Sequence, residues 1–357
     1  MTAFPHLFTP LALGSITAPN RIFMAPMTRS RARPDDLVTE LHSRYYQQRA
    51  TAGLIISEGV HPSADGKGYN RTPGLFTQAH ATAWRQVTDA VAEADGQMVA
   101  QLMHCGRVGH AFNKAEGARF LAPSAIACKE EIFTEQGAQP MPVPEAMSLS
   151  DIKTVIADYV TSARLGIEAG FVGVELHCTS GYLPAQFLST GTNQRTDEYG
   201  GSVENRLRFV LETLAALAEA IGSDRIGLRI CPGNPFNDLH DDDPEETFAA
   251  LLQALNTLGL AYVHAIRMPS VGFNSLALVR RHFNGVLIGN DSFTAEEADQ
   301  MIASGQVDAV AFGRPFVANP DLPERFEQGA PLAKINFKTL YGGGAEGYTD
   351  YPSLSNS

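Results

Sequence analysis

Three side chains that can form hydrogen bonds lie close together near the middle of the chain: His177, Ser180 and Tyr182. They follow Phe171–Leu176, an apolar run that is interrupted only by a glycine and by Glu175. A run of this length and composition predicts a strand that is buried on both faces, as in a parallel sheet. A single buried histidine is more often a hydrogen-bonded core residue than a functional one. The group therefore needs support from the rest of the chain.

That support comes from the ends of the other predicted strands, which also carry polar or glycine residues. In a barrel enzyme the reactive groups lie at the carboxyl ends of the strands, and a phosphate often binds after strands seven and eight. A glycine lets backbone amides approach a phosphate, and an arginine can bind it with two hydrogen bonds. Taken alone, Arg314 could equally well cap a helix or pair with a surface carboxylate. The predicted mouth residues are Pro26, Met27, Thr28, Glu58, Gly59, Gln101, His177, Arg229, Gly289, Asn290, Asp291, Ser292, Gly313 and Arg314.

The elements that would position these residues alternate along the chain. Strands are predicted at 22–24, 54–57, 98–102, 173–176, 226–230, 262–266, 286–288 and 309–312. Amphipathic helices are predicted at about 39–52, 80–94, 149–169, 203–221, 244–258, 295–303 and 321–328. This alternation predicts an α/β fold, a (β/α)8 TIM barrel. A doubly wound sheet is the alternative, but the first βα turn lacks the glycine-rich dinucleotide fingerprint.

Two local signals and one long connection refine this prediction. Ser202 is expected to cap the helix that begins at Val203, and Thr294 with Glu297 is expected to form a capping box. Residues 104–146, between strands three and four, contain several glycines and prolines and no helical period. A connection of this length is usually a lid or an inserted subdomain. We therefore expect residues 1–357 to form one barrel domain, with 104–146 as a lid or hairpin over its mouth.

Composition excludes several classes of function. The net charge of −12 argues against binding to nucleic acid or to an anionic membrane surface. No run of about 18 apolar residues predicts a membrane span, and the first ten residues do not resemble a secretory signal. The four cysteines are widely spaced, which fits a reducing compartment better than a disulfide framework. We expect a soluble, cytoplasmic protein.

Two sequence motifs are followed by residues that do not fit the function each motif usually indicates. Residues 342–347 match G-x-G-x-x-G, but no βαβ unit follows them, so a nucleotide site is a poor interpretation. The run His240–Asp243 could hold a hard metal ion, but Pro244 and Glu245 follow it. The acidic residues more simply decorate a helix N-terminus, and we expect no metal.

Residues 171–206 resemble the active-site region of the old yellow enzymes, the FMN-dependent ene-reductases. The matching residues are His177, Tyr182, Phe187-Leu188-Ser189 and the run R-T-D-E-Y-G-G-S-V-E-N-R at 195–206. The resemblance extends over nearly the whole chain, from Pro19-Asn20-Arg21 to the segment 347–352.

The resemblance implies an enzyme that takes a hydride from NADPH or NADH onto a bound, non-covalent FMN. The C=C bond of an activated alkene (an α,β-unsaturated carbonyl compound, a nitroalkene or a maleimide) would then accept the hydride from flavin N5 in a ping-pong cycle. His177 and Ser180 would bind the activating oxygen, where negative charge develops. Tyr182 would donate the proton.

The resemblance also implies the roles of the cofactor-binding residues. Thr28 would tune the flavin, and Arg229 would place positive charge beside the edge that becomes anionic. Met103 and Tyr341 would belong to the substrate pocket. The flavin itself would be lined by Pro26, Met27, Thr28, Gly59 and Gln101, and its phosphate end would be held by Ser292, Phe293, Gly313 and Arg314.

Three positions depart from the family pattern. Ser180 stands in place of asparagine or histidine, and its shorter hydroxyl would reach the substrate oxygen directly, through a water, or not at all. Asp291 stands where a phosphate-loop glycine is expected, and we expect its carboxylate to turn toward solvent. Met103 stands in place of a tryptophan. The replacement by methionine would open the pocket floor.

Two rival functions remain. The larger barrel flavoproteins with an iron–sulfur cluster need clustered cysteine thiolates, which this chain lacks. A low-turnover flavin- or phenol-binding protein of the same fold is the alternative that the Ser180 substitution suggests. The chain is expected to be a monomer or a homodimer.

Overall fold

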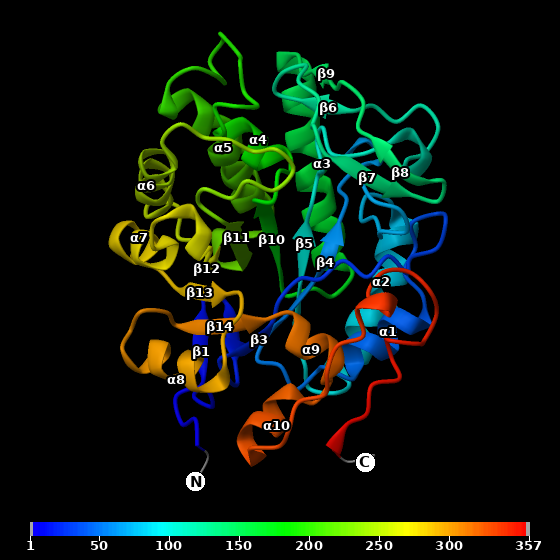
Figure 1. The fold of residues 1–357 in the computed structure, drawn as a ribbon, viewed down its shortest axis with the longest axis vertical. Coiled ribbons are helices and arrows are strands. Elements are labelled where there is room, and N and C mark those ends of the chain that lie inside the picture. Colours follow the sequence, from blue (N-terminus) through cyan, green and yellow to red (C-terminus); the bar gives the residue numbers. More distant parts are fainter. Residues whose placement is uncertain (1–2, 355–357) are drawn as a thin grey trace.

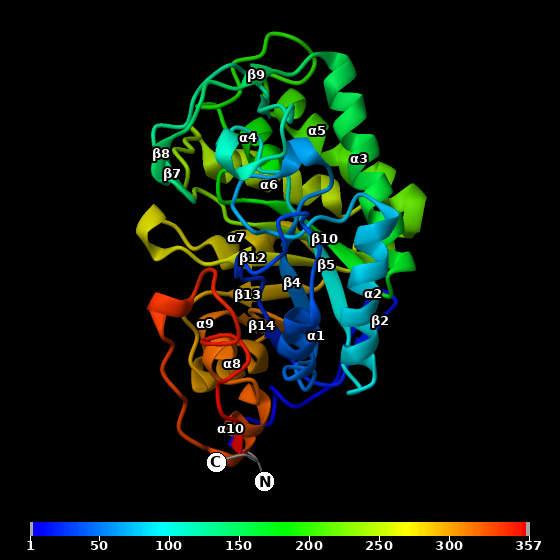
Figure 2. The same cartoon turned by 90° about the vertical axis from the view of Figure 1, so that its right-hand side faces the viewer.

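The computed structural model describes residues 3–354 and contains a closed barrel of eight parallel strands. Going around the barrel, the strand order is β10-β11-β12-β13-β14-β3-β4-β5, and β5 pairs with β10 to close it. Figures 1 and 2 show these strands at the centre of the molecule with helices around them. The predicted (β/α)8 barrel is confirmed. The barrel strands are β3 (Ile22–Met24), β4 (Ile55–Val60), β5 (Met98–Leu102), β10 (Gly173–Cys178), β11 (Ile226–Ile230), β12 (Tyr262–Ile266), β13 (Leu287–Asn290) and β14 (Ala309–Phe312).

The barrel strands are buried on both faces, as their nearly continuous apolar runs predict. Their outward side chains, such as Leu176 and Val263, pack against the helices in the main hydrophobic core. A short hairpin of β1 (Leu11–Leu13) and β2 (Ile16–Ala18), which the sequence reading did not identify, joins the lower interior core with Phe23. The hairpin thus packs at the amino end of the barrel and leaves the carboxyl end for the site.

The helices follow from amphipathic runs with explicit caps. Ser202 accepts a hydrogen bond from the backbone N–H of Asn205, and Thr294 accepts one from that of Glu297, as predicted. The Glu297 carboxylate does not complete the predicted capping box, however, because it forms an ion pair with Arg267 instead. The helices are α1 (Glu40–Gln47), α2 (Gln78–Ala92), α3 (Leu149–Glu168), α4 (Leu183–Leu188), α5 (Val203–Ile221), α6 (Pro244–Leu255), α7 (Ser275–His282), α8 (Ala295–Ala303), α9 (Arg314–Ala318) and α10 (Leu322–Gln328).

The structure corrects several boundaries. The strand β10 continues through His177 to Cys178, so this histidine lies within the strand and not after it. In the same way β4 includes Gly59, and β13 extends to Asn290. Three short helices, α4, α7 and α9, were not predicted. They contain 5 to 8 residues each, too few turns for a clear helical period.

The connection 104–146 contains two small sheets. The strands β7 (Glu131–Thr134) and β8 (Gly137–Pro140) form an antiparallel hairpin, while β6 (Leu121–Ala122) pairs in parallel with β9 (Glu145–Ala146). The hairpin lies in the upper part of the molecule in Figure 1. Its Ile132 packs in one apolar cluster with Met103 and Tyr182, which ties the insertion to the carboxyl end of the barrel.

The C-terminal segment is held against the barrel by two arginines. Arg29 donates hydrogen bonds to the carbonyl oxygens of Leu340 and Gly347, and Arg31 donates to those of Thr339 and Gly344. These bonds hold residues 339–347 in a fixed path along the barrel. Within residues 3–354, no helix has the length and apolarity needed to cross a membrane.

Candidate active site

A cavity of about 740 Å³ opens at the carboxyl ends of the barrel strands. Its volume lies within the range of about 300–1,000 Å³ that is typical of ligand pockets. Many of the residues predicted at the mouth line it, and they come from five different strand ends and from the C-terminal segment. The predicted residues on its wall are Pro26, Met27, Ser180, Arg229, Asn290, Asp291, Ser292, Phe293, Gly313, Arg314 and Tyr341.

The remaining predicted residues, which do not line this cavity, are Thr28, Glu58, Gly59, Gln101, Met103, His177, Tyr182 and Gly289. Strand register places His177 beside a residue that does line it. His177 on β10 pairs with Arg229 on β11, and Arg229 pairs with His264 on β12. Residues that pair in register on neighbouring strands point to the same face. His177 therefore shares the barrel interior with Arg229.

A buried polar network lies beneath the cavity and ends at Arg229. Gln101 donates a hydrogen bond to Glu175 (2.7 Å), and the other Glu175 oxygen lies 2.9 Å from Nδ1 of His264. Arg229 contacts His264 and donates to Oδ1 of Asn290 at 2.8 Å. Burial acts to raise the pKa of Glu175, but His264 and Arg229 outweigh it and lower that pKa. Glu175 is therefore a buried anion that holds His264, and His264 together with Asn290 fixes the orientation of Arg229.

His177 is a neutral imidazole beside this network. Burial, together with the nearby charge of Arg229, lowers the pKa of His177 to about 3. Its Nδ1 atom is buried and has no hydrogen-bond partner among the described residues. A neutral imidazole carries one N–H donor and one acceptor. His177 can thus donate to a ligand without carrying charge.

Tyr182 packs edge-to-face against His177, with 4.9 Å between the ring centroids. Its hydroxyl donates a hydrogen bond to that of Tyr69 at 3.2 Å. Burial raises the pKa of Tyr182 well above its ordinary value, so the phenol keeps its proton at neutral pH. The two side chains thus form a compact pair, in which the His177 N–H can donate directly and the Tyr182 proton can donate once it turns from Tyr69.

Ser180 has an unusual backbone conformation. Its φ of 57° lies in the left-handed region, and Gly181 follows with φ of 79°. The side-chain amide of Asn237 donates to the Ser180 carbonyl at 2.6 Å and fixes this turn. A Cβ atom on Gly181 would lie 2.4 Å from that of Asn237, so only glycine fits there. Asparagine adopts the left-handed conformation more readily than serine does.

The Met103 side chain occupies the space that a side chain at position 59 would fill. A Cβ atom on Gly59 would lie 2.6 Å from the sulfur of Met103, so the absent side chain makes room for the methionine. Met103 in turn packs in one cluster with Tyr182 and Cys105. Thr28 follows β3 and is partly buried.

The other end of the cavity carries Arg314, the first residue of α9. Its guanidinium lies 3.4 Å from the carboxylate of Asp291 and 3.5 Å from the hydroxyl of Ser292. The expectation that Asp291 turns away toward solvent is therefore wrong. Its half-exposed carboxylate remains on the cavity wall beside the arginine.

Comparison with known proteins identifies the family. The family model described as "NADH:flavin oxidoreductase / NADH oxidase family" matches residues 6–333. The chain belongs to this family. A curated relative from Leishmania infantum, described as a probable flavin mononucleotide-dependent alkene reductase, is 41% identical; the match covers 98% of this chain and 97% of the relative. A 12-oxophytodienoate reductase 2 from Arabidopsis thaliana is 38% identical, with coverage of 98% and 96%.

Solved structures of the same family superpose closely on the chain. A morphinone reductase in complex with tetrahydroNAD has a TM-score of 0.93 at 44% identity and covers 98% of both chains. An old yellow enzyme homologue from Zymomonas mobilis has a TM-score of 0.94 at 39% identity and covers 98% of this chain and 99% of its own. The resemblance read from residues 171–206 is thus confirmed over almost the full length.

The residues of the cavity fit the flavin cofactor of this family. Two arginines, Arg229 and Arg314, line the cavity together with apolar side chains such as Met27 and Phe312. The backbone at Gly313 packs closely against Met27, because a Cβ atom there would lie only 3.2 Å from the Met27 sulfur, so glycine keeps this part of the wall free of a side chain. A flat ring system beside Arg229 and a phosphate beside Arg314 satisfy this distribution of charge.

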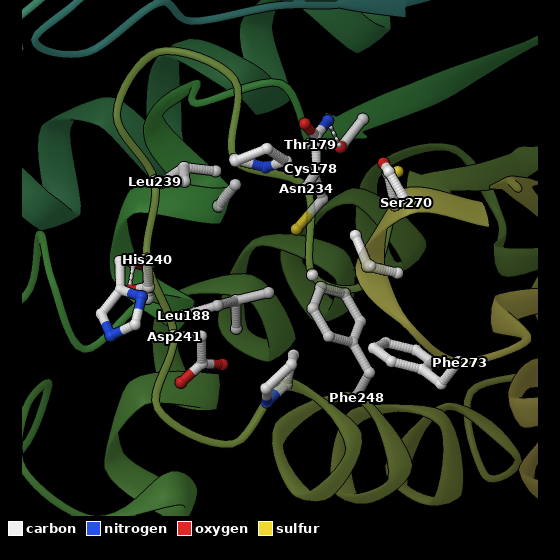
Figure 3. Close-up of a pocket in the computed structure, with 17 residues that line it drawn as sticks. Cys178, Thr179, Leu188, Asn234, Leu239, His240, Asp241, Phe248, Ser270 and Phe273 are labelled. Atoms are coloured by element: carbon white, nitrogen blue, oxygen red, sulfur yellow. Dashed lines mark hydrogen bonds between the residues drawn. The ribbon is translucent and has the colours of Figure 1, made fainter. Parts of the chain in front are cut away.

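A second cavity, of about 390 Å³, lies between the ends of β10 and β11 and the helices α4 and α6 (Figure 3). Cys178 lines it and is next to His177, so the alternation along β10 directs the two side chains to opposite faces. Asn234 belongs to the walls of both cavities and donates to the Thr179 hydroxyl at 3.1 Å. This outer cavity is thus separate from the barrel interior. No group of three or more histidine, cysteine, aspartate or glutamate residues that could hold a metal ion occurs within residues 3–354.

The sequence reading missed several residues of the site. Glu175 was visible as a charge inside an otherwise apolar strand, and His264 interrupts the strand 262–266 in the same way. A buried charge needs a partner, so these two exceptions could have been matched to each other. Tyr69 and Asn237 gave no such signal, because they lie on loops whose positions depend on the fold.

Proposed function

We propose that the protein is an FMN-dependent NAD(P)H oxidoreductase that reduces the C=C bond of activated alkenes. The observation that carries this proposal is the neutral His177 in contact with the protonated Tyr182, beside a cavity that two arginines line. Unsaturated carbonyl compounds, nitroalkenes and maleimides are the substrate class that such a pair of donors suits. A bound FMN would supply what side chains lack, the transfer of a hydride from NADPH or NADH to the alkene.

Arg229 and Arg314 would hold the cofactor at its two ends. The network of Glu175, His264 and Asn290 fixes the Arg229 guanidinium, so its charge is directed at the cavity without reorganisation. Pro26, Met27, Thr28, Gly59 and Gln101 would surround the ring system. Ser292, Phe293 and Gly313 would surround the phosphate end.

His177 would bind the activating oxygen of the substrate through its N–H group. Negative charge grows on this oxygen as the β carbon accepts hydride, and a donor that is already in place stabilises it without moving. Because the pKa of His177 is lowered to about 3, the imidazole stays neutral and does not bind a general anion in place of the substrate.

Tyr182 would protonate the α carbon from its hydroxyl group. Its raised pKa keeps the phenol protonated, and its O–H would turn from Tyr69 to the substrate carbon when that carbon becomes basic. Ser180 would contribute a weaker second contact to the substrate oxygen. Met103 and Tyr341 would shape the wall around the substrate.

The insertion 104–146 would act as a lid that excludes water from the mouth. Ile132 of its hairpin packs with Met103 and Tyr182, so the insertion is positioned to shield the proton donor. The described cysteines are all free and buried, and we propose a cytoplasmic location with a monomer or homodimer as the working form.

The proposal is tested by following oxidation of NADPH and of NADH by the purified holoenzyme with 2-cyclohexenone as acceptor, under anaerobic conditions. The expected result is stoichiometric formation of cyclohexanone, together with a flavin spectrum that is bleached by the nicotinamide and restored by the enone. A protein that binds flavin and phenols but forms no cyclohexanone would support the low-turnover binding function instead.

A further inference from the structure

The loop between β13 and α8 holds Asp291 in a fixed conformation at the phosphate end of the cavity. Asp291 and Ser292 have φ of 86° and 55°, both in the left-handed region. Arg267 donates to both of their carbonyl oxygens, at 2.7 Å and 2.8 Å. Arg267 is itself held by an ion pair with Glu297 and lies 3.7 Å from the centroid of the Phe293 ring. The loop is therefore clamped from outside the cavity.

This clamp directs the Asp291 carboxylate toward Arg314. The two groups are 3.4 Å apart and both are about half exposed, so the pair lies at the opening of the cavity and not in the core. The Ser292 hydroxyl lies 3.2 Å from the same carboxylate oxygen and 3.5 Å from Arg314. Carboxylate and phosphate oxygens bind guanidinium groups with the same geometry. The Asp291 carboxylate and the Ser292 hydroxyl both contact Nη2 of Arg314, so they compete with a phosphate ligand for this donor.

We propose that Asp291 is an internal competitor for Arg314, which reduces the share of flavin affinity that comes from the 5′-phosphate. This inference rests on the proposed function, because it assumes that the cavity binds a flavin. A phosphate that reaches Arg314 must displace the carboxylate and then remain near a like charge, whereas the ring system at the Arg229 end is unaffected. The protein therefore discriminates between FMN and riboflavin, the same ring system without phosphate, less sharply than it would with an uncharged residue at position 291.

The test measures dissociation constants of FMN and of riboflavin for apoprotein prepared from the holoenzyme, by quenching of flavin fluorescence. Asp291→Asn removes the charge and keeps the size, and asparagine tolerates the left-handed conformation. The matched control is Asp95→Asn, an exposed aspartate with φ of 60° that does not line the cavity. We expect Asp291→Asn to tighten FMN binding about five- to tenfold, as removal of one nearby like charge predicts. Riboflavin binding, and both constants in Asp95→Asn, should stay unchanged.

Three results would overturn the inference. Weaker FMN binding in Asp291→Asn would mean that the carboxylate orients Arg314 for the phosphate. Equal tightening of FMN and riboflavin would mean that the substitution acts through loop conformation. An unchanged FMN constant would mean that the carboxylate does not compete. In each case a wild-type protein that binds FMN leaves the proposed function standing, whereas failure of the wild type to bind either flavin would contradict both.

Discussion

The hydroxyl groups of Tyr182 and Tyr69 lie 3.2 Å apart, with their rings edge-to-face at 6.2 Å between centroids. Tyr182 comes from the end of the barrel strand β10, and Tyr69 from the loop after β4. Burial raises the pKa of Tyr69 to about 12, and it also raises the pKa of Tyr182 well above its ordinary value. Both phenols are therefore protonated at neutral pH. The proposed proton donor has a hydrogen-bond acceptor that keeps its O–H bond in a defined direction.

Replacing Tyr182 with phenylalanine should slow the alkene half-reaction by about 10²–10⁴-fold, the usual contribution of a general acid. Reduction of the flavin by nicotinamide should change less than twofold, because no proton from Tyr182 is needed there. Stopped-flow measurement of the two half-reactions separates these effects. Tyr69→Phe serves as the neighbouring control, since it removes the acceptor and leaves the Tyr182 proton in place. Equal slowing of both half-reactions in Tyr182→Phe would show that this residue only shapes the pocket.

His177 should contribute more than Ser180 to binding the substrate oxygen. His177→Ala removes a donor that burial holds neutral, so we expect a loss of about 10²–10³-fold in kcat/KM for cyclohexenone. Ser180→Ala should cost less than about tenfold, since a neutral hydrogen bond contributes only about 0.5–1.5 kcal/mol. Steady-state kinetics with the two variants give the ratio. Equal losses would contradict the weaker role that we assign to Ser180.

Ser180→Asn should both tighten ligand binding and stabilise the fold. The native φ of 57° is a conformation that asparagine favours, so the variant should be as stable as the wild type or more stable, by up to about 1 kcal/mol. Its amide would also reach further into the cavity and should tighten the binding of phenolic ligands. Thermal unfolding and titration with a phenol measure the two effects. Loss of stability would mean that the longer side chain collides with the loop of Asn237.

The sequence allowed the barrel and the mouth residues to be predicted because both depend on local patterns. Apolar runs predicted the positions of the strands, and β5, β11, β12 and β14 begin and end at the predicted residues. Arg229 and Arg314 could be placed because the carboxyl ends of parallel strands meet at one mouth.

What could not be predicted depends on contacts between distant segments. The Glu175–His264 pair joins residues 89 positions apart, and Arg267 reaches across 24 positions to fix the loop of Asp291. The direction of the Asp291 carboxylate was predicted wrongly for this reason. Electrostatic repulsion from a phosphate suggested solvent, but the clamp and the nearby Arg314 decide its position.

Arg314→Ala should yield protein that contains little flavin after purification. The arginine has a charge and a position suited to the phosphate, and charge-assisted hydrogen bonds of this kind are among the strongest in proteins. Arg33→Ala is the matched control, because Arg33 is also paired with one aspartate and its side chain is 56% exposed, against 55% for Arg314. The ratio of flavin absorbance to protein absorbance reports occupancy. A fully loaded Arg314→Ala protein would exclude this arginine as the phosphate ligand.

The stability of the fold should depend on pH through Glu58, a fully buried residue of β4. Burial raises its pKa to about 7, even though the backbone N–H and the guanidinium of Arg29 favour the anion. The ordinary value is 4.5, so between pH 4.5 and 7 the native state binds more protons than the unfolded state. The free energy of unfolding must therefore fall as pH rises through this window, by on the order of 3 kcal/mol in total.

Glu58→Gln removes this titration and keeps an acceptor for the N–H of Arg29, which lies 3.4 Å from the carboxylate. We expect the variant to gain stability relative to the wild type as pH rises from 5 to 8, with little difference at pH 5. Urea unfolding at pH 5, 6.5 and 8 with saturating FMN measures the difference, and Glu93→Gln, an exposed position, is the control. The expected control curve is parallel to that of the wild type. If Glu58→Gln also runs parallel to the wild type, the carboxyl group of Glu58 is ionised throughout this range and its pKa is not raised.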